Sequence, residues 1–255
     1  MALKLNMLKE SEQKLRLNLT KRGINAPPPA DVAIVIDVSG SFEREHTDGT
    51  IQKLLERLVP WGMVFDPDKK LDVFTFSDGA GHAHHVGEIT PETTEDYVRR
   101  SIVGRVPGWR GGTDYSFVLE SAMRIFGWLP SQEAAKPGGS GLFGFFKKAA
   151  PAAAPAPVQA TKRPSIVLFI TDGENSDKDR TRQVLRQSQE RHDQIYFLFI
   201  GVHDGLDFPF LKQIGDEFDN TGLAVIRDVR KLMTADDDVL NDMLIGDELL
   251  TWLKK

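Results

Sequence analysis

Continuous apolar runs recur along the chain, separated by stretches of mixed polarity. Four strong runs occupy residues 32–36 (VAIVI), 71–76 (LDVFTF), 165–170 (SIVLFI) and 195–200 (IYFLFI), and a weaker one covers 223–226. Apolar runs rich in β-branched and aromatic residues are typical of strands that are buried on both faces, as in a parallel sheet. The runs therefore predict the strands of a buried central sheet.

Apolar residues at helical spacing mark the stretches between these runs. In residues 47–64, Ile51, Leu54 and Leu58 fall on one helical face. A helix over 91–103 would begin at Pro91, which suits a first helical turn. The other predicted helices span 114–128, 177–191, 207–218 and 236–254. Strands that alternate with helices predict an α/β fold with a doubly wound, mostly parallel sheet flanked by helices.

Two segments stand outside this alternation. Residues 1–30 form an N-terminal arm whose apolar positions fit either strands or one helical face, so the pattern does not decide. Residues 131–163 are rich in Gly, Ala and Pro, which is typical of a flexible insertion. We therefore expect one domain over 31–255, interrupted at 131–163. The run LFGFF (142–146) is either incidental within a loop or a docking peptide for a partner or a membrane surface.

Charge and composition narrow the classes of function. The 255 residues include 32 basic and 37 acidic residues, and the net charge of −5 disfavours general binding of nucleic acid. The absence of cysteine excludes disulfides, cysteine-zinc sites and thiol catalysis. The N-terminus lacks the apolar core of a signal peptide, and no stretch approaches the ~20 apolar residues of a membrane span. We expect a cytoplasmic protein without a membrane span.

Three short motifs place oxygen-bearing side chains at strand ends and at a helix start. DVSGS follows the first strand and contributes Asp37, Ser39 and Ser41; GGT opens a helix with Thr113; TDG follows the 165–170 strand and contributes Asp172. Loops at the carboxyl ends of parallel strands converge in one crevice. Two carboxylates and three hydroxyls are therefore predicted to meet there.

The chemistry of these five groups selects the kind of ion. Ligands without sulfur or imidazole favour a hard cation. Two carboxylates and small hydroxyls suit an octahedral ion that keeps some waters, so Mg²⁺ is preferred, with Mn²⁺ or Ca²⁺ as alternatives. Taken singly, each motif also fits a helix N-cap or a turn, because Asp, Ser and Thr are common at both. Their order and their positions at strand ends favour the metal site.

Together, DVSGS, GGT and TDG resemble the von Willebrand factor A (vWA) family and its metal-ion-dependent adhesion site. The resemblance covers roughly residues 31–227. It implies a Rossmann-like fold, direct or switching metal contacts from Ser39, Ser41 and Thr113, and contacts largely through water from Asp37 and Asp172. It also implies a protein partner whose Asp or Glu carboxylate completes the metal shell. The stretches LDVFTFSDGAGH and GWRGGTDY are similar to the bacterial tellurite-resistance-type members, which act in stress responses.

A second metal site is conceivable at His82, His84 and His85, because imidazole is a common zinc ligand. No fourth ligand stands out, so a solvated turn that leads into a strand over 85–89 is favoured.

Several residues flank the three motifs. Arg105, Trp109 and Arg110 precede GGT, and they form either an ordinary loop or part of a partner-binding surface, in which Trp and Arg are enriched. Asp114 and Glu174 also lie beside the motifs, where we expect them to tune charge or to cap helices rather than to bind metal.

The leading hypothesis for function is a metal-dependent protein-binding module without catalytic activity. A Mg²⁺-dependent hydrolase or phosphatase is the alternative, because a metal with an open position can polarise a phosphoryl oxygen. Against it, the sequence has no G-x-x-x-x-G-K-[ST] phosphate loop and no evident general base near the motifs. A third hypothesis is a structural component of a larger assembly.

Overall fold

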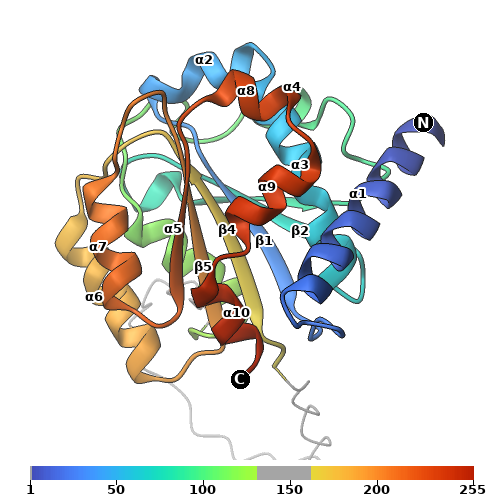
Figure 1. Ribbon diagram of the computed structural model, residues 1–255. Helices are drawn as coiled ribbons and strands as arrows, with labels where there is room; N and C mark the ends of the chain where they lie inside the picture. Colours follow the sequence, from blue (N-terminus) through green and yellow to red (C-terminus); the bar gives the residue numbers. More distant parts are fainter. Residues whose placement is uncertain (1, 131–161) are drawn as a thin grey trace, which may run out of the picture.

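The computed structural model describes residues 2–130 and 162–255 (Figure 1). The predicted insertion, except for its last two residues, lies outside the described residues, and so does its LFGFF run. The described chain contains a six-stranded sheet in the order β3-β2-β1-β4-β5-β6. Only β3 runs antiparallel to its neighbour, so the predicted mostly parallel sheet is confirmed. The strands are β1 (Asp31–Asp37), β2 (Leu71–Phe76), β3 (His84–Ile89), β4 (Ser165–Thr171), β5 (Ile195–Val202) and β6 (Thr221–Ile226).

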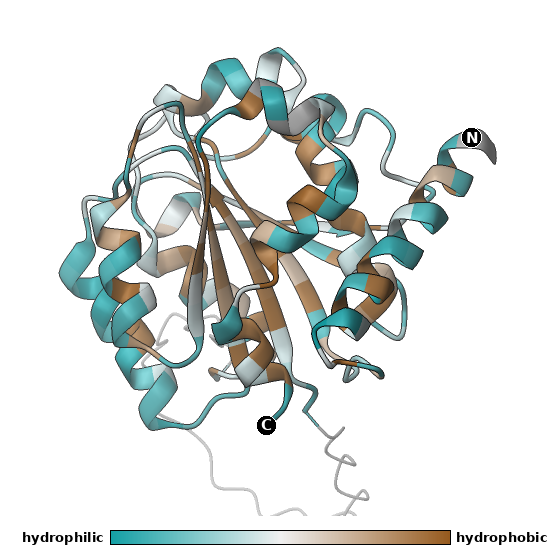
Figure 2. Ribbon diagram, in the orientation of Figure 1, coloured by the Kyte–Doolittle hydropathy of each residue, from teal (hydrophilic) through white to brown (hydrophobic). Residues whose placement is uncertain are grey.

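Helices cover both faces of the sheet (Figure 1). Along β1, Val32, Ile34 and Ile36 join one buried cluster, whereas Ala33 and Val35 join the other. This alternation buries β1 on both faces, which explains its continuous apolar sequence. Figure 2 shows the apolar strands enclosed by helices with polar outer surfaces. The helices are α1 (Ala2–Lys21), α2 (Glu43–Thr47), α3 (Thr50–Phe65), α4 (Tyr97–Ser101), α5 (Ser116–Ile125), α6 (Lys178–Glu190), α7 (Pro209–Glu217), α8 (Val229–Thr234), α9 (Asp237–Leu244) and α10 (Asp247–Leu253).

Most of the N-terminal arm forms the helix α1, so the helical alternative holds for residues 2–21. Leu8, Leu15 and Leu19 are buried in the same cluster as the inner faces of α3 and α9. Polar bonds add to this packing: Lys14 pairs with Asp236, and other α1 side chains bond the acidic start of α9. The arm is therefore packed onto the sheet domain along its length.

Two predicted helices differ most in extent from the structure. The helix expected over 91–103 is limited to α4, because Thr94 donates its hydroxyl to the carbonyls of Thr90 and Pro91 and holds this stretch in turns. The closing helix expected over 236–254 is divided into α9 and α10 at Ile245 and Gly246. Both differences reflect local backbone bonding that apolar periodicity does not record.

The strand order creates a switch point between β1 and β4. The chain builds β2 and β3 on one side of β1 and then returns to build β4, β5 and β6 on the other side. Loops that leave β1 and β4 therefore diverge to opposite faces and leave a crevice between them, the usual ligand position in open α/β sheets. No described helix is long and apolar enough to cross a membrane.

Candidate metal centre

Asp37 is the last residue of β1, and its side chain is fully buried. Its Oδ1 accepts the backbone N–H of Ser39 at 2.8 Å, and its Oδ2 accepts the hydroxyl of Thr171 at 2.6 Å. Thr171 is itself the last residue of β4, so the carboxylate bridges the ends of two neighbouring strands. These bonds fix the carboxylate at the switch point.

A continuous line of oxygens leads from Ser39 to the second carboxylate. The Oγ atoms of Ser39 and Ser41 lie 3.2 Å apart, and Ser41 Oγ donates to Asp172 Oδ1 at 3.1 Å. Ser39 and Asp172 are buried, whereas Ser41 is exposed. The structure therefore brings together the predicted groups of DVSGS and TDG, and the line of oxygens opens to solvent at Ser41.

The GGT loop lies against both other loops. Ser39 forms an isolated parallel bridge with Gly111, and Gly40 N donates to Gly111 O at 2.9 Å. On the other side, Thr113 O accepts the N–H of Ser176 at 2.8 Å. The hydroxyl of Thr113 makes no hydrogen bond with any described residue, so it is available for a ligand.

Two carboxylates, Asp114 of the GGT loop and Asp78 of the loop after β2, hold these two loops together. Asp78 Oδ1 accepts Gly112 N at 2.9 Å, and Asp114 Oδ2 accepts Gly79 N at 2.9 Å. A Cβ atom at Gly111 would collide with Asp78 Oδ1 and would lie 2.7 Å from Ser77 Oγ. Glycine at this position therefore permits the close approach of the two loops. Asp114 thus ties the GGT loop to the loop that follows β2.

Asp177, which was not predicted from the sequence, links the GGT and TDG segments. Its two oxygens accept the backbone N–H groups of Tyr115 and Ser116, both at 2.9 Å, at the start of α5. They also accept the Asn175 amide at 2.7 Å and the Thr181 hydroxyl at 3.0 Å. Burial raises the pKa of Asp177, but the hydrogen bonds from Ser116, Asn175 and Tyr115 outweigh it and hold that pKa below its ordinary value. This ionised side chain fixes one metal loop against the other.

The two motif carboxylates oppose each other electrostatically. Burial, followed by the charge of Asp172, raises the pKa of Asp37 to about 7. Burial is also the main cause of the raised pKa of Asp172. A divalent cation beside both groups would offset burial and repulsion together. All the converging side-chain donors are hard oxygens, so this chain's residues fit Mg²⁺, Mn²⁺ or Ca²⁺.

His46 is buried and contacts the backbone of the DVSGS loop. Its Nε2 lies 2.7 Å from Asp37 O, and its ring packs edge-on against Phe42 and Trp109, with centroid distances of 5.5 and 5.2 Å. Trp109 is half-buried in this stack, whereas Arg110 forms an ion pair with Glu43 at the surface. The loop before GGT is thus partly structural, and the exposed side of Trp109 remains available to a partner.

Two histidines of the conceivable zinc site have separate partners. His85 lies on β3 and bonds Asp72 at 2.7 Å, while His82 lies 3.4 Å from Asp78. Within residues 2–130 and 162–255, no group of three or more His, Asp or Glu side chains could hold a metal, so the zinc hypothesis has no support there.

Glu174 accepts Phe210 N at 3.0 Å, which ties the TDG loop to α7.

Comparison with known proteins identifies the family. The family described as "vWA found in TerF C terminus" matches residues 29–129 and 148–255. The chain belongs to this vWA family. The match includes all three motif segments and excludes the whole of α1. A Bacillus subtilis protein, "Uncharacterized protein YcbR", is 23% identical over 231 residues, which cover 89% of this chain and 78% of the relative.

Solved structures support the vWA fold. The proximal thread matrix protein 1 from the mussel byssus aligns with a TM-score of 0.51 in one crystal form, at 16% identity over 86% of this chain and 48% of that protein. A second structure of the same protein, with a zinc-occupied MIDAS motif, aligns with a TM-score of 0.52 at 16% identity over 88% of this chain and 49% of that protein. The vWA chain thus spans about half the length of these structures.

Proposed function

We propose that this vWA chain is a metal-dependent protein-binding module, and that Asp37, Ser39, Ser41, Thr113 and Asp172 hold its metal. The observation that carries the proposal is the line of oxygens that runs from Ser39 through Ser41 to Asp172, beside the Asp37 carboxylate. Burial raises the pKa of both carboxyl groups, and the charge of Asp172 raises that of Asp37 further, so both are costly in their charged forms. A bound cation relieves both costs, and the exposed Ser41 end leaves one side open to a ligand.

Mg²⁺ is the ion that we propose, with Mn²⁺ or Ca²⁺ as substitutes. Two carboxylates and three hydroxyls form a sparse ligand set, which suits an ion that keeps waters in its shell. A MIDAS motif occupied by zinc in the mussel protein supports a divalent ion at this position of the fold. In the proposal, Ser39, Ser41 and Thr113 bind the ion directly, and the two carboxylates act largely through water.

The open position is proposed to take an Asp or Glu side chain of a protein partner. Hydroxyl ligands donate little charge, so the ion stays electrophilic and attracts an anionic ligand. The exposed side of Trp109 would supply contact area, since Trp is common in binding hot spots. By analogy with its family, we propose that the module acts in the cytoplasm, in a tellurite-resistance or stress-response system.

We propose binding rather than catalysis for this centre. Both oxygens of Asp37 accept hydrogen bonds from neighbouring donors, and His46 bonds a backbone carbonyl from a buried position. Neither group is therefore free to act as a general base on an attacking water. A Mg²⁺-dependent hydrolase or phosphatase is the alternative that the experiment below would detect.

The test is capture of partners from the native host in Mg²⁺ and in EDTA. We expect one or more proteins to bind only with Mg²⁺, and to be lost with Ser39→Ala and Thr113→Ala. Ser176→Ala is the matched control, because its exposed side chain lies beside the same loop. Capture that is unchanged by EDTA would refute metal-dependent binding. Metal-dependent hydrolysis of phosphate esters or nucleotides that stops in Asp37→Ala would replace binding with catalysis.

A further inference from the structure

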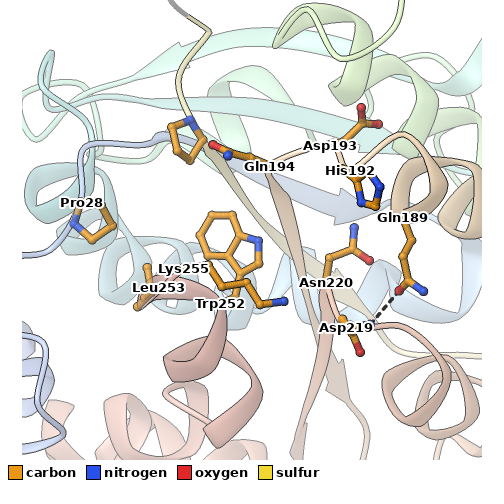
Figure 3. A pocket seen from close by; sticks show the side chains of 11 residues that line it. Pro28, Gln189, His192, Asp193, Gln194, Asp219, Asn220, Trp252, Leu253 and Lys255 are labelled. Carbon is orange, nitrogen blue, oxygen red and sulfur yellow. Dashed lines mark hydrogen bonds between the residues drawn. The ribbon is translucent and has the colours of Figure 1, made fainter.

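A hollow of about 370 Å³ lies at the amino ends of β4, β5 and β6, at the opposite end of the sheet from the metal loops. Its lining includes Pro164 before β4, Gln194 before β5 and Asn220 before β6. Figure 3 shows the Trp252 ring on one side of the hollow, with Asn220 and His192 on the other. The hollow is large enough for an amino-acid side chain and part of its backbone.

The apolar walls of the hollow are flat. Trp252 is half-buried, and its ring is held by Tyr196 at a centroid distance of 5.6 Å. Pro28, Pro164 and Leu253 add further apolar surface. A fixed indole face favours a planar group that stacks on it, and it binds a planar cation more tightly than a neutral group.

Asn220 lines the same hollow and contains an unsatisfied acceptor. The residue is only 6% exposed, and its Nδ2 donates to Ile195 O at 3.1 Å, which fixes the orientation of the amide. Its Oδ1 is buried and has no partner among the described residues. A buried acceptor without a donor is costly, so a ligand that carries N–H groups would be favoured here once the amide turns towards the hollow.

The charges around the hollow are mostly negative. An adjoining hollow of about 380 Å³ shares Asp219 and Lys255 with the first and is also lined by Asp247 and Glu248. Asp219, Asp247 and Glu248 form no ion pair with any described residue. The carboxylates outnumber Lys255, and together they favour a cationic ligand that extends across both hollows.

We propose that the two hollows bind a basic segment of a partner protein, with an arginine in the first hollow and a second basic residue in the adjoining one. The guanidinium is planar, carries five N–H donors and stacks on aromatic rings. It can stack on Trp252 while it pairs with Asp219, whereas a lysine ammonium lacks the planar face. This surface is separate from the metal centre and does not depend on it.

The test uses the peptide acetyl-Gly-Arg-Lys-Gly-amide, titrated into the full chain at low salt while the indole N–H signal of Trp252 is followed by NMR. A second peptide carries citrulline in place of arginine, which keeps the shape and removes the charge. We expect the arginine peptide to shift the Trp252 signal and the citrulline peptide to bind at least about tenfold more weakly. Added salt should weaken binding.

Variants separate this surface from other parts of the molecule. Asp219→Asn and Trp252→Leu should each weaken the arginine peptide by about tenfold or more, whereas Asp216→Asn, at an exposed position on α7, should leave binding unchanged. Asp219→Asn removes charge without changing size, so it tests the proposal even if Trp252→Leu fails to fold. EDTA and Asp37→Ala should have no effect, which distinguishes this site from the metal centre. Equal binding of both peptides, or a Trp252 shift with adenosine but not with the arginine peptide, would overturn the proposal.

Discussion

The two ends of the parallel sheet hold carboxylates in opposite ways. At the carboxyl ends, Asp37 is fully buried and both of its oxygens accept hydrogen bonds. At the amino ends, Asp219 and its acidic neighbours are exposed and form no ion pair with any described residue. Burial makes the first group dependent on a compact ion of high charge, because water cannot screen it. The exposed carboxylates at the amino ends are screened by water and salt and so interact only weakly with one another. We therefore expect them to bind a larger organic cation, in a contact that added salt weakens.

The same comparison predicts where mutation is costly. A buried polar group that loses its partner destabilises the fold strongly, whereas an exposed charge contributes little. Substitutions at the metal end should therefore change the free energy of unfolding by several kcal/mol, and substitutions at the amino end should mainly change binding. The three predictions below run from the largest expected effect to the smallest.

Asp177→Ala should lower the free energy of unfolding by about 3 kcal/mol, because the N–H donors at the start of α5 and in the TDG loop lose their acceptor. Urea denaturation in EDTA measures this loss. Asp179→Ala, at an exposed position in the first turn of α6, is the control and should change stability by less than about 0.5 kcal/mol. Similar losses in the two variants would show that Asp177 does not link the metal loops.

His46 should make stability depend on pH. Burial lowers its pKa from 6.5 to about 4, so the unfolded chain takes up the proton first as the pH falls. Its contribution is present above pH 6.5 and is lost as the pH falls towards 4. Between pH 7 and pH 5, the wild type should lose about 2 kcal/mol relative to His46→Gln.

The wild type and His46→Gln both retain Asp37, whose raised pKa acts in the opposite direction. The contribution of Asp37 to stability is present at low pH and is lost as the pH rises through about 7. Taking the difference between the two proteins therefore removes most of that effect. The measurement is urea denaturation in EDTA at several pH values. Parallel curves for the wild type and His46→Gln would contradict the burial of a neutral His46.

Asp219→Asn should change the free energy of unfolding by less than about 0.5 kcal/mol, because the side chain is exposed and forms no ion pair with any described residue. Thermal unfolding with and without the arginine peptide measures both stability and binding. A large loss of stability in the free protein would mean that this carboxylate supports the fold, and the contrast between the two ends of the sheet would fail.

The sequence predicts the parts of this molecule that have a strong period or a strong motif. The apolar runs place β1, β2, β4 and β5 to within two residues, because strands buried on both faces admit few polar residues. The motif order brings the loops of Ser39, Gly111 and Thr171 together at the switch point, since parallel strands end on the same side of the sheet.

Features that depend on tertiary contacts were not predictable in this way. Asp177 resembles an ordinary N-cap residue in sequence, yet its donors come from a helix about 60 positions earlier, with separations of 61 and 62 residues. The Oδ1 atom of Asn220 lacks a hydrogen-bond donor because the bond from Nδ2 to Ile195 O fixes the orientation of the amide. Apolar spacing likewise runs through Ile245 and Gly246, where the structure ends α9 and begins α10.

The most direct test of the metal centre is the thermal stability of wild type and Asp37→Ala, titrated with Mg²⁺ or Mn²⁺ after removal of metal with EDTA. At about 100-fold excess over the dissociation constant, one bound ion should stabilise the wild type by about 2.7 kcal/mol. Asp37→Ala should lose most of this gain in stability, because it removes one of the two carboxylates whose burial and repulsion the ion offsets. An equal metal-induced shift in both proteins, or no shift in either, would contradict the proposed metal centre.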